Sequence, residues 1–126
     1  MTLSDPVSNM LTIIRNAAMR GLSTASFPLS NFKLRICNKL LEQKYLDSCQ
    51  TKEREITVKI SYIGKRCSFQ HLNSVSIPSR RVHLKVGEIK KFCRQGIYLI
   101  STSHGLLTNH ESLQQNKGGK VILQIN

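Results

Sequence analysis

The stretch Gly-Ile-Tyr-Leu-Ile-Ser-Thr-Ser-His-Gly, residues 96–105, joins a short apolar run directly to a run of small polar residues. Residues 97–100 are all apolar, which is typical of a strand buried on both faces. The three hydroxyl residues that follow, with His104 and Gly105 behind them, have the composition of a turn. The stretch therefore predicts a buried strand that ends in a hydroxyl-rich turn, within a second half of the chain that is mainly β.

The N-terminal part of the chain predicts two amphipathic helices with a short extended piece between them. Asp5 is a suitable N-cap, and Pro6 suits the first helical position because its missing N–H has no partner there in any case. Gly21 can end this helix, and Ser30 or Asn31 can cap the next. The expected apolar stripes are Val7, Met10, Leu11 and Ile14 in the first helix, and Phe32, Ile36, Cys37, Leu40 and Leu41 in the second. On the other face of the second helix we expect a solvated basic stripe of Lys33, Arg35 and Lys39.

Alternating apolar and polar residues at 56–62 predict a strand with one buried face, ended by a turn at Gly64-Lys65. Further extended runs are expected at 67–77, interrupted at Asn73-Ser74, and at 81–86. One or two turns of helix are expected at 88–94. Thr108-x-x-Glu111 matches a capping box, which predicts a short helix at 109–115 before a last strand at 120–125.

These elements predict an α+β fold of two small lobes. The N-terminal lobe, residues 1–66, reads α-β-α-β-β. The C-terminal lobe, residues 67–126, is mainly β with a short helix and carries the Ser-Thr-Ser turn.

The charge balance points to a polyanionic partner. In 126 residues there are 19 Lys+Arg and 7 Asp+Glu, a formal net charge of +12. Such a surplus favours nucleic acid as the partner, with an anionic membrane surface second. The chain has no apolar stretch long enough to span a bilayer and no signal-peptide pattern, so we expect a soluble, intracellular protein. The four cysteines are too widely spaced for a zinc site, so we expect free thiols, with no metal or cofactor.

Three local features are candidates for binding RNA. The hydroxyls of residues 101–103 can donate and accept hydrogen bonds to base edges, 2′-hydroxyls or phosphates, although an ordinary polar turn has the same composition. Arg80 and Arg81 follow Pro78-Ser79 and either bind phosphates or solubilise a loop. Gly118-Gly119 lacks the sequel of a P-loop and predicts a turn that a backbone or a ligand approaches closely.

Catalytic interpretations have weaker support. A Ser/His hydrolase would need a G-x-S-x-G elbow, which is absent. His71, His83, His104 and His110 form no H-E-x-x-H arrangement, so we expect them to face solvent or RNA. An RNA-processing enzyme with His104 or His110 as general base remains the alternative, and a membrane-surface role ranks third. We expect no catalytic residues and no small-molecule substrate.

Four segments occur together in the order and spacing of one known family. They are residues 5–17, with Asp5-Pro6-Val7 and Ile14-Arg15-Asn16-Ala17; Ile77-Pro78-Ser79-Arg80-Arg81-Val82; residues 96–108, with Ser101-Thr102-Ser103-His104-Gly105; and Gly118-Gly119. The Ser-Thr-Ser-x-Gly segment is highly specific. From residue 5 to its C-terminus the chain resembles the bacterial-type eighth small-subunit ribosomal protein family.

The resemblance implies a non-catalytic, two-lobed α+β protein. It would bind an internal-loop region of a stem in the central domain of small-subunit ribosomal RNA, support assembly, and lie beside other small-subunit proteins. Internal loops suit this role because they open base edges that a regular A-form helix hides. The RNA-contacting residues implied are Ser101, Thr102, Ser103 and Gly105 in the turn, Arg81 and His83 after the central strands, Gly118 and Gly119, and Lys33. We expect Arg15, Lys33, Arg80 and Arg81 to contact phosphates, and His104 and Lys120 to join the same surface.

Four positions depart from the family's pattern. His104 stands where a lysine is usual, Asn31 where a lysine is common, Lys120 where glutamate is usual, and His83 where an aromatic is common. These changes redistribute the basic footprint. They favour an organellar member of the family, in the mitochondrial matrix rather than a plastid or the bacterial cytoplasm.

Overall fold

The computed structural model describes residues 6–75, 81–93 and 96–126. The chain divides into two compact units. One is Asn9–Gln70, and the other is Met1–Ser8 with His71–Asn126. The architecture is mixed α+β with antiparallel strands, as predicted. The expected lobe boundary at residue 66 stays a prediction, because these units reflect packing within the chain and not independent folding.

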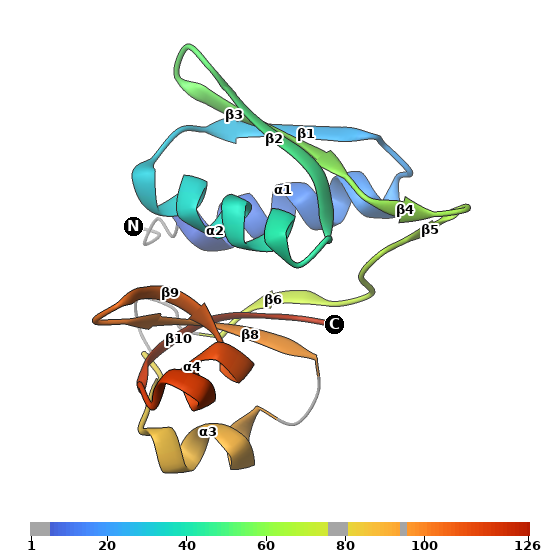
Figure 1. The fold of residues 1–126 in the computed structure, drawn as a ribbon. Helices are drawn as coiled ribbons and strands as arrows, with labels where there is room; N and C mark the ends of the chain where they lie inside the picture. The colour runs from blue at the N-terminus through green and yellow to red at the C-terminus, as the bar shows by residue number, and fades with distance from the viewer. Residues whose placement is uncertain (1–5, 76–80, 94–95) are drawn as a thin grey trace, which may run out of the picture. The chain divides into compact units, whose positions relative to one another are not determined.

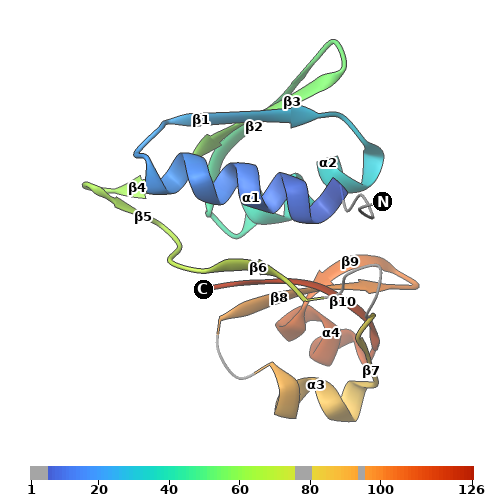
Figure 2. The same ribbon diagram turned by 180° about the vertical axis from the view of Figure 1, so that it is seen from behind.

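The Asn9–Gln70 unit is a three-stranded antiparallel sheet with helices α1 and α2 on one face (Figure 1, Figure 2). The strand order is β1-β3-β2. Two further short strands, β4 and β5, form a separate hairpin. The elements in chain order are α1 (Pro6–Met19), β1 (Thr24–Pro28), α2 (Asn31–Glu42), β2 (Leu46–Lys52), β3 (Glu55–Ile60), β4 (Tyr62–Ile63) and β5 (Arg66–Cys67).

Helix α1 follows its predicted boundaries, and its predicted stripe is buried except for Val7, which is half-buried. It begins at Pro6, whereas its expected cap, Asp5, lies outside the described residues. Its buried side chains are Met10, Leu11, Ile14 and Ala17. The chain leaves the helix through Gly21, which has φ +72 and is followed by Leu22, whose N–H donates to the Ala17 carbonyl at 2.9 Å. Only glycine takes this left-handed conformation at little cost, so Gly21 sets the end of the helix.

Helix α2 corrects one expectation about its basic face. Ser30 is the N-cap, and its hydroxyl accepts from the Lys33 N–H at 3.2 Å. Ile36, Cys37 and Leu40 are buried as predicted, while Phe32 and Leu41 are half-buried. The expected solvated position is wrong for Lys33, which is only 7% exposed and donates from Nζ to the Pro28 carbonyl at 3.0 Å. A long aliphatic stem can be buried when its ammonium group finds such a partner.

The strands of this unit were only partly predicted. The alternation expected at 56–62 is confirmed as far as Ile60 in β3, where Ile56, Val58 and Ile60 are buried, whereas Tyr62 is half-buried and belongs to β4. Strand β2, by contrast, was not predicted from Leu46-Asp-Ser-Cys-Gln-Thr-Lys52, which has few β-branched residues and little alternation. It exists because it pairs with β3 along its length, Cys49 opposite Val58 and Thr51 opposite Ile56.

The second unit is a five-stranded sheet in the order β6-β10-β8-β9, with β7 also paired to β10. Helices α3 and α4 lie on one face of it (Figure 1, Figure 2). A core of Leu84, Ile89, Tyr98, Ile100 and Val121 forms there. The elements are β6 (Leu72–Ser74), β7 (His83–Leu84), α3 (Val86–Phe92), β8 (Ile97–Thr102), β9 (Gly105–Thr108), α4 (Asn109–Gln115) and β10 (Gly119–Ile125).

Local signals predicted α4 well and the short strands poorly. The capping box is confirmed, because the Thr108 hydroxyl accepts from the Glu111 N–H while the Glu111 carboxylate accepts from the Thr108 N–H. Asn73 and Ser74 do not interrupt a strand; they pair with Gln124 and Leu123 of β10. The extended run expected at 81–86 is shorter, since α3 already begins at Val86. Pairing with β10 decides these short strands, and a local pattern does not contain that information.

Candidate nucleic-acid interface

The hydroxyl-rich turn connects β8 and β9 as a tight hairpin. Thr102 pairs with Gly105 across it, and Ser103 and His104 form the exposed tip. The Thr102 hydroxyl accepts from the His104 N–H at 3.1 Å and donates to the Gly105 carbonyl at 2.8 Å. Gly105 has φ +98, and neither tip residue has a positive φ, so the glycine supplies the left-handed step that closes the turn.

The tip leaves one hydroxyl and one imidazole exposed beside each other. Ser103 Oγ lies 3.2 Å from His104 Nδ1. Thr102 holds the shape of the turn through its own hydroxyl, so Ser103 and His104 are the tip side chains free to face a ligand. Both can donate and accept hydrogen bonds.

Three predicted site residues form one row across three strands at the base of this hairpin. Lys120 of β10 pairs with Ser101 of β8 on one side and with His83 of β7 on the other. Residues directly opposite one another in antiparallel strands point to the same face, with Cβ atoms about 4.5–5.5 Å apart. His83 is exposed, and Ser101 and Lys120 are half-buried. The row therefore presents an imidazole, an ammonium group and a hydroxyl side by side.

Gly118 and Gly119 let two other parts of the backbone come close. A Cβ on Gly119 would lie 2.1 Å from the Ser101 carbonyl oxygen, and a Cβ on Gly118 would lie 2.5 Å from the Leu84 carbonyl oxygen. The sequence left open whether a backbone or a ligand approaches this pair; in the structure the chain's own β7 and β8 do. The glycines thus bring the hydroxyl turn, the row and β7 together.

The unit that carries the turn and the row has more basic than acidic side chains. Arg81 is exposed two residues before His83. Both side-chain carboxylates in the described part of the unit accept from the backbone N–H of a helix N-cap residue, Glu88 from Lys85 and Glu111 from Thr108. Its basic residues are Arg81, Lys85, Lys90, Lys91, Lys117 and Lys120. A surplus of this kind attracts phosphates and makes binding sensitive to salt.

The remaining predicted residues lie elsewhere. Arg15 belongs to α1, where its guanidinium donates to the Thr12 hydroxyl at 3.1 Å. Lys33 is buried in α2 against the Pro28 carbonyl. Both are in the Asn9–Gln70 unit. Arg80 lies outside the described residues. Of the thirteen predicted positions, those of the turn, the glycine pair and the row come together, with Arg81 close by in the chain.

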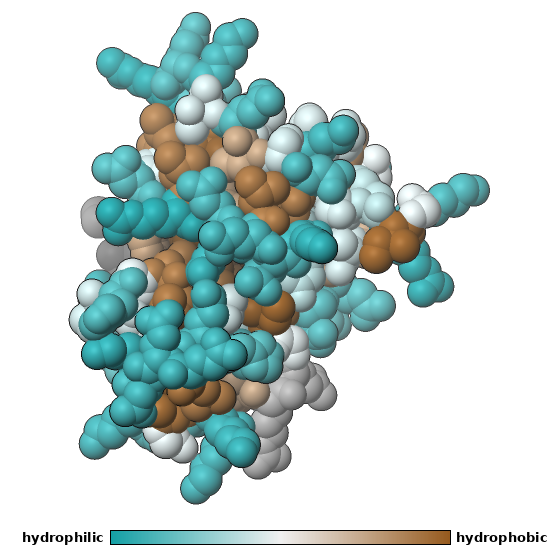
Figure 3. All heavy atoms as spheres, viewed as in Figure 1, coloured by the Kyte–Doolittle hydropathy of each residue, from teal (hydrophilic) through white to brown (hydrophobic). Residues whose placement is uncertain are grey.

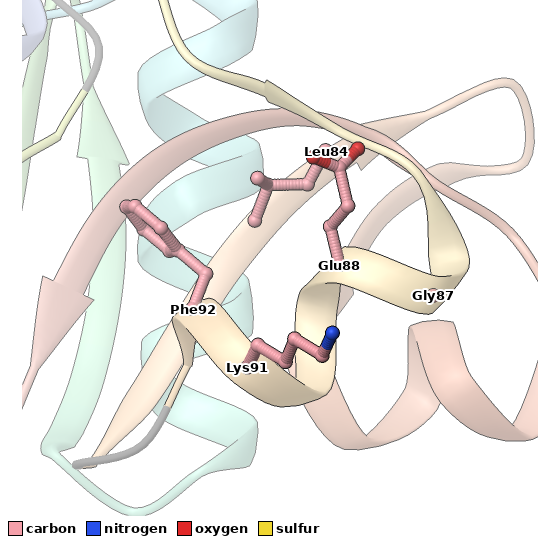
Figure 4. A pocket seen from close by; sticks show the side chains of 5 residues that line it. All are labelled: Leu84, Gly87, Glu88, Lys91 and Phe92. Carbon is pink, nitrogen blue, oxygen red and sulfur yellow. The ribbon is translucent and has the colours of Figure 1, made fainter.

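A surface hollow beside α3 was not predicted from the sequence. It is lined by Leu84, Gly87, Glu88, Lys91 and Phe92 (Figure 4). Leu84 is buried and His83 is exposed, so these neighbours point to opposite faces of β7. The hollow is therefore on the helix side of the strand, and the row is on the other side. Its lining combines the apolar side chains of Leu84 and Phe92 with the charged side chains of Glu88 and Lys91, and the Glu88 carboxylate accepts from the Lys85 N–H.

The cysteines are free thiols, and burial raises the pKa of the Cys37 thiol well above its usual range and that of Cys93 to about 11. Both are therefore protonated at neutral pH. Within residues 6–75, 81–93 and 96–126, no group of three or more His, Cys, Asp or Glu side chains is placed to hold a metal ion. No helix in these ranges is long and apolar enough to cross a bilayer.

Comparison with known proteins gives one consistent family. The family model described as ribosomal protein S8 matches residues 5–126. The small ribosomal subunit protein uS8 of Mesorhizobium japonicum is 35% identical over 131 residues, which cover 99% of each chain. The proteins of the same name from Agrobacterium fabrum, 31% identical over 99% of each chain, and from Mesoplasma florum, 35% identical over 94% of this chain and 95% of its own, are also similar.

Proposed function

This chain belongs to the ribosomal protein S8 family, and from that premise we propose that it is a structural constituent of the small ribosomal subunit that binds small-subunit ribosomal RNA. Relatives that span nearly its whole length carry the name of a small-subunit protein, which supports the ribosomal role. Its formal net charge of +12 fits a partner made of RNA.

The observation that carries the RNA-binding role is the meeting of the Thr102–Gly105 hairpin with the row of Ser101, Lys120 and His83. Small hydroxyls on a rigid hairpin can approach the edges of bases in an opened internal loop. Lys120 and Arg81 supply positive charge for the phosphates on either side. Specific and non-specific contacts are thus available side by side on the same sheet.

In finer detail, we propose that the ligand is a central-domain stem with an internal loop, and that binding supports subunit assembly beside neighbouring small-subunit proteins. Ser101, Thr102, Ser103, His104 and Gly105 would select the site, with Gly118 and Gly119 holding the turn in place. The sugar-phosphate backbone of the RNA would be contacted by Arg15, Arg80, Arg81, His83 and Lys120. A contact by Lys33 would require its ammonium group to leave the Pro28 carbonyl.

For the compartment, we propose a mitochondrial ribosome. The supporting residues are those at which this chain departs from the bacterial type, His104, Asn31, Lys120 and His83. Immunofluorescence with a mitochondrial marker in the source cells should show co-localisation, and a purely cytoplasmic signal would contradict the proposal.

The interpretation as an RNA-processing enzyme finds no support. The family is structural. Ser103 and His104 are adjacent residues at an exposed tip, a geometry that gives neither a shielded nucleophile nor an oriented base. Incubation of the pure protein with a loop-containing RNA tests this directly, and cleavage that His104→Ala or His110→Ala abolishes would reverse the conclusion.

Competition binding tests the proposed function. The full chain is titrated with the small-subunit central-domain stem and with a fully paired duplex of equal length, at two salt concentrations. We expect a preference for the loop-containing stem that persists at the higher salt, because base-edge contacts are less sensitive to salt than phosphate contacts. Equal affinities that fall together with salt would show that net charge alone drives binding.

Two variants separate the proposed roles. Ser103→Ala should weaken binding to the stem by about fivefold, the equivalent of one hydrogen bond of roughly 1 kcal/mol, and leave duplex binding nearly unchanged. Arg81→Ala should weaken binding to the stem and to the duplex by the same factor, and it should reduce the slope of log affinity against log salt concentration by about 1. Equal losses on both RNAs for both variants would contradict this assignment.

A further inference from the structure

The α1–β1 turn and the β4–β5 hairpin lie side by side at one end of the Asn9–Gln70 unit (Figure 1, Figure 2). One hydrogen bond joins the turn to the hairpin, and a second joins the turn to Ile60, the last residue of β3, the strand that precedes the hairpin. The Tyr62 hydroxyl donates to the Leu22 carbonyl at 2.6 Å, and the Ile60 N–H donates to the Ser23 carbonyl at 2.9 Å. Gly64, with φ +66, closes the hairpin turn. The two segments therefore form one defined surface rather than two independent loops.

This surface exposes large apolar side chains. Met19 is 80% exposed, Ile63 76% and Leu22 47%, and these are the three highest values among the exposed large hydrophobic residues of the described chain. In Figure 3 the apolar patch at the β4–β5 hairpin projects between hydrophilic side chains. Burying such side chains elsewhere in the fold would have been favourable by about 1.5–3 kcal/mol each, so their exposure together suggests a partner.

The same segments carry only positive charge. Residues 19–23 and 61–68 contain Arg20, Lys65 and Arg66 and no carboxylate. All three cations are exposed. Apolar side chains bordered by cations are complementary to an apolar hollow that is bordered by carboxylates, since the apolar parts pack together and the charges at the rim are opposite.

We propose that this hairpin-end surface, formed by Met19, Arg20, Leu22, Ile63, Lys65 and Arg66, docks an acidic neighbouring protein of the small subunit. Ile63 would enter an apolar hollow, and the three cations would pair with carboxylates at its rim. The proposal rests on the proposed function, because it takes the partner from the same subunit, but it uses a surface that includes none of the residues assigned to RNA.

A protein fits this surface better than RNA does. RNA presents phosphates, sugars and stacked bases, and an aliphatic side chain finds apolar contact there only by unstacking bases, at a cost of a few kcal/mol. RNA-facing sheets and loops use aromatic or hydroxyl side chains for such contacts, whereas the exposed side chains here are Met, Leu and Ile. Methionine and branched aliphatic residues are common in the cores of protein interfaces.

Site-specific photo-crosslinking tests the partner. Ile63 is replaced by benzoylphenylalanine in the full chain, the protein is assembled into small subunits, and the products of irradiation are identified by mass spectrometry. The same probe at Leu29, an exposed apolar residue of the same unit that is 39% exposed, is the matched control. We expect the Ile63 probe, and not the Leu29 probe, to crosslink to a segment of a subunit protein that contains Asp or Glu. A crosslink to RNA, or none in assembled subunits, would overturn the proposal.

A charge substitution gives an independent measurement with the identified partner. Ile63→Asp should weaken binding to that protein by about tenfold or more, because it places a carboxylate in an apolar, acidic site, whereas Leu29→Asp should change it less than twofold. Both variants should bind the isolated RNA stem as the wild type does. If Ile63→Asp and Leu29→Asp weaken binding to the partner protein equally, the proposed docking surface is refuted and the proposed function is not affected. If the wild-type protein fails to bind the RNA stem or to enter small subunits, the proposed function is refuted, and the docking proposal falls with it.

Discussion

Gly119→Ala is the substitution whose consequence the structure defines most sharply. The added Cβ would lie 2.1 Å from the Ser101 carbonyl oxygen, 2.9 Å from its carbonyl carbon and 3.2 Å from the Thr102 Cα. All three are backbone atoms, so no side-chain rotation relieves the clash. Strand β10 must move away from β8 at the point where the hydroxyl turn begins.

The size of the effect follows from that displacement. The Ser101 oxygen must retreat by roughly 1 Å, which exceeds the tolerance of ladder hydrogen bonds, whose N···O distances span only about 2.7–3.2 Å. Overpacking of this kind costs about 1–3 kcal/mol, and one or two lost hydrogen bonds add about 0.5–1.5 kcal/mol each. We therefore expect Gly119→Ala to lower the free energy of unfolding by about 2–5 kcal/mol. RNA binding should fall as well, because the Lys120–Ser101 pairing shifts with the strand.

Urea unfolding of the full chain, followed by circular dichroism, measures this change. Gly87→Ala is the matched control, because a Cβ there meets nothing within 4 Å and Gly87 lies in α3. The control should be unchanged or more stable by up to about 1 kcal/mol, since alanine is the better helix former. If Gly119→Ala does not fold, Gly119→Ala in the more stable Gly87→Ala background brings the comparison into range. Equal stability of the two single variants would refute the reasoning.

Three further expectations concern the turn, the buried lysine and pH. Thr102→Val removes the hydroxyl that bonds His104 N–H and the Gly105 carbonyl, so it should cost about 0.5–1.5 kcal/mol in urea unfolding, and Thr102→Ser should restore most of the loss. Lys33→Ala should cost about 1–3 kcal/mol, because it unpairs the Pro28 carbonyl and empties buried space, while Arg35→Ala on the exposed face should change stability by less than about 0.5 kcal/mol; equal values would place Lys33 at the surface. Burial raises the pKa of the Cys37 thiol and raises that of Cys93 to about 11, so above the ordinary thiol pKa of 9.0 the unfolded chain releases protons that the folded chain retains, and stability should fall as the pH rises from about 9 to about 11. Cys37→Ala should flatten that fall, and an unaltered slope would contradict the assignment.

Features carried by short-range patterns were predicted correctly from the sequence. The start of α1 at Pro6, the capping box of Thr108 and Glu111 and the alternation in β3 each depend on residues within about one turn or one strand of each other. The position of the hydroxyl turn after a buried strand belongs to the same class. These elements follow from local hydrogen bonding and from which side chains avoid water.

The features that were missed depend on partners distant in sequence. Strand β2 has a polar sequence and forms because β3 pairs with it, and β6 and β7 exist as strands through β10. Lys33 looked like part of a solvated stripe, but the Pro28 carbonyl receives its ammonium group. No periodicity within a window of the chain contains these pairings.

The sequence by itself therefore determined the α+β class, the two helices of the first half, the basic character and the hydroxyl turn, because composition and local periodicity are enough to specify each of them. Only the tertiary structure decided that Ser101, Lys120 and His83 share one row, and that the space beside Gly118 and Gly119 belongs to the chain's own backbone. The physical reason is that register between distant strands is chosen by mutual hydrogen bonding and burial of the whole sheet, and a shift of one residue would send every one of these side chains to the other face.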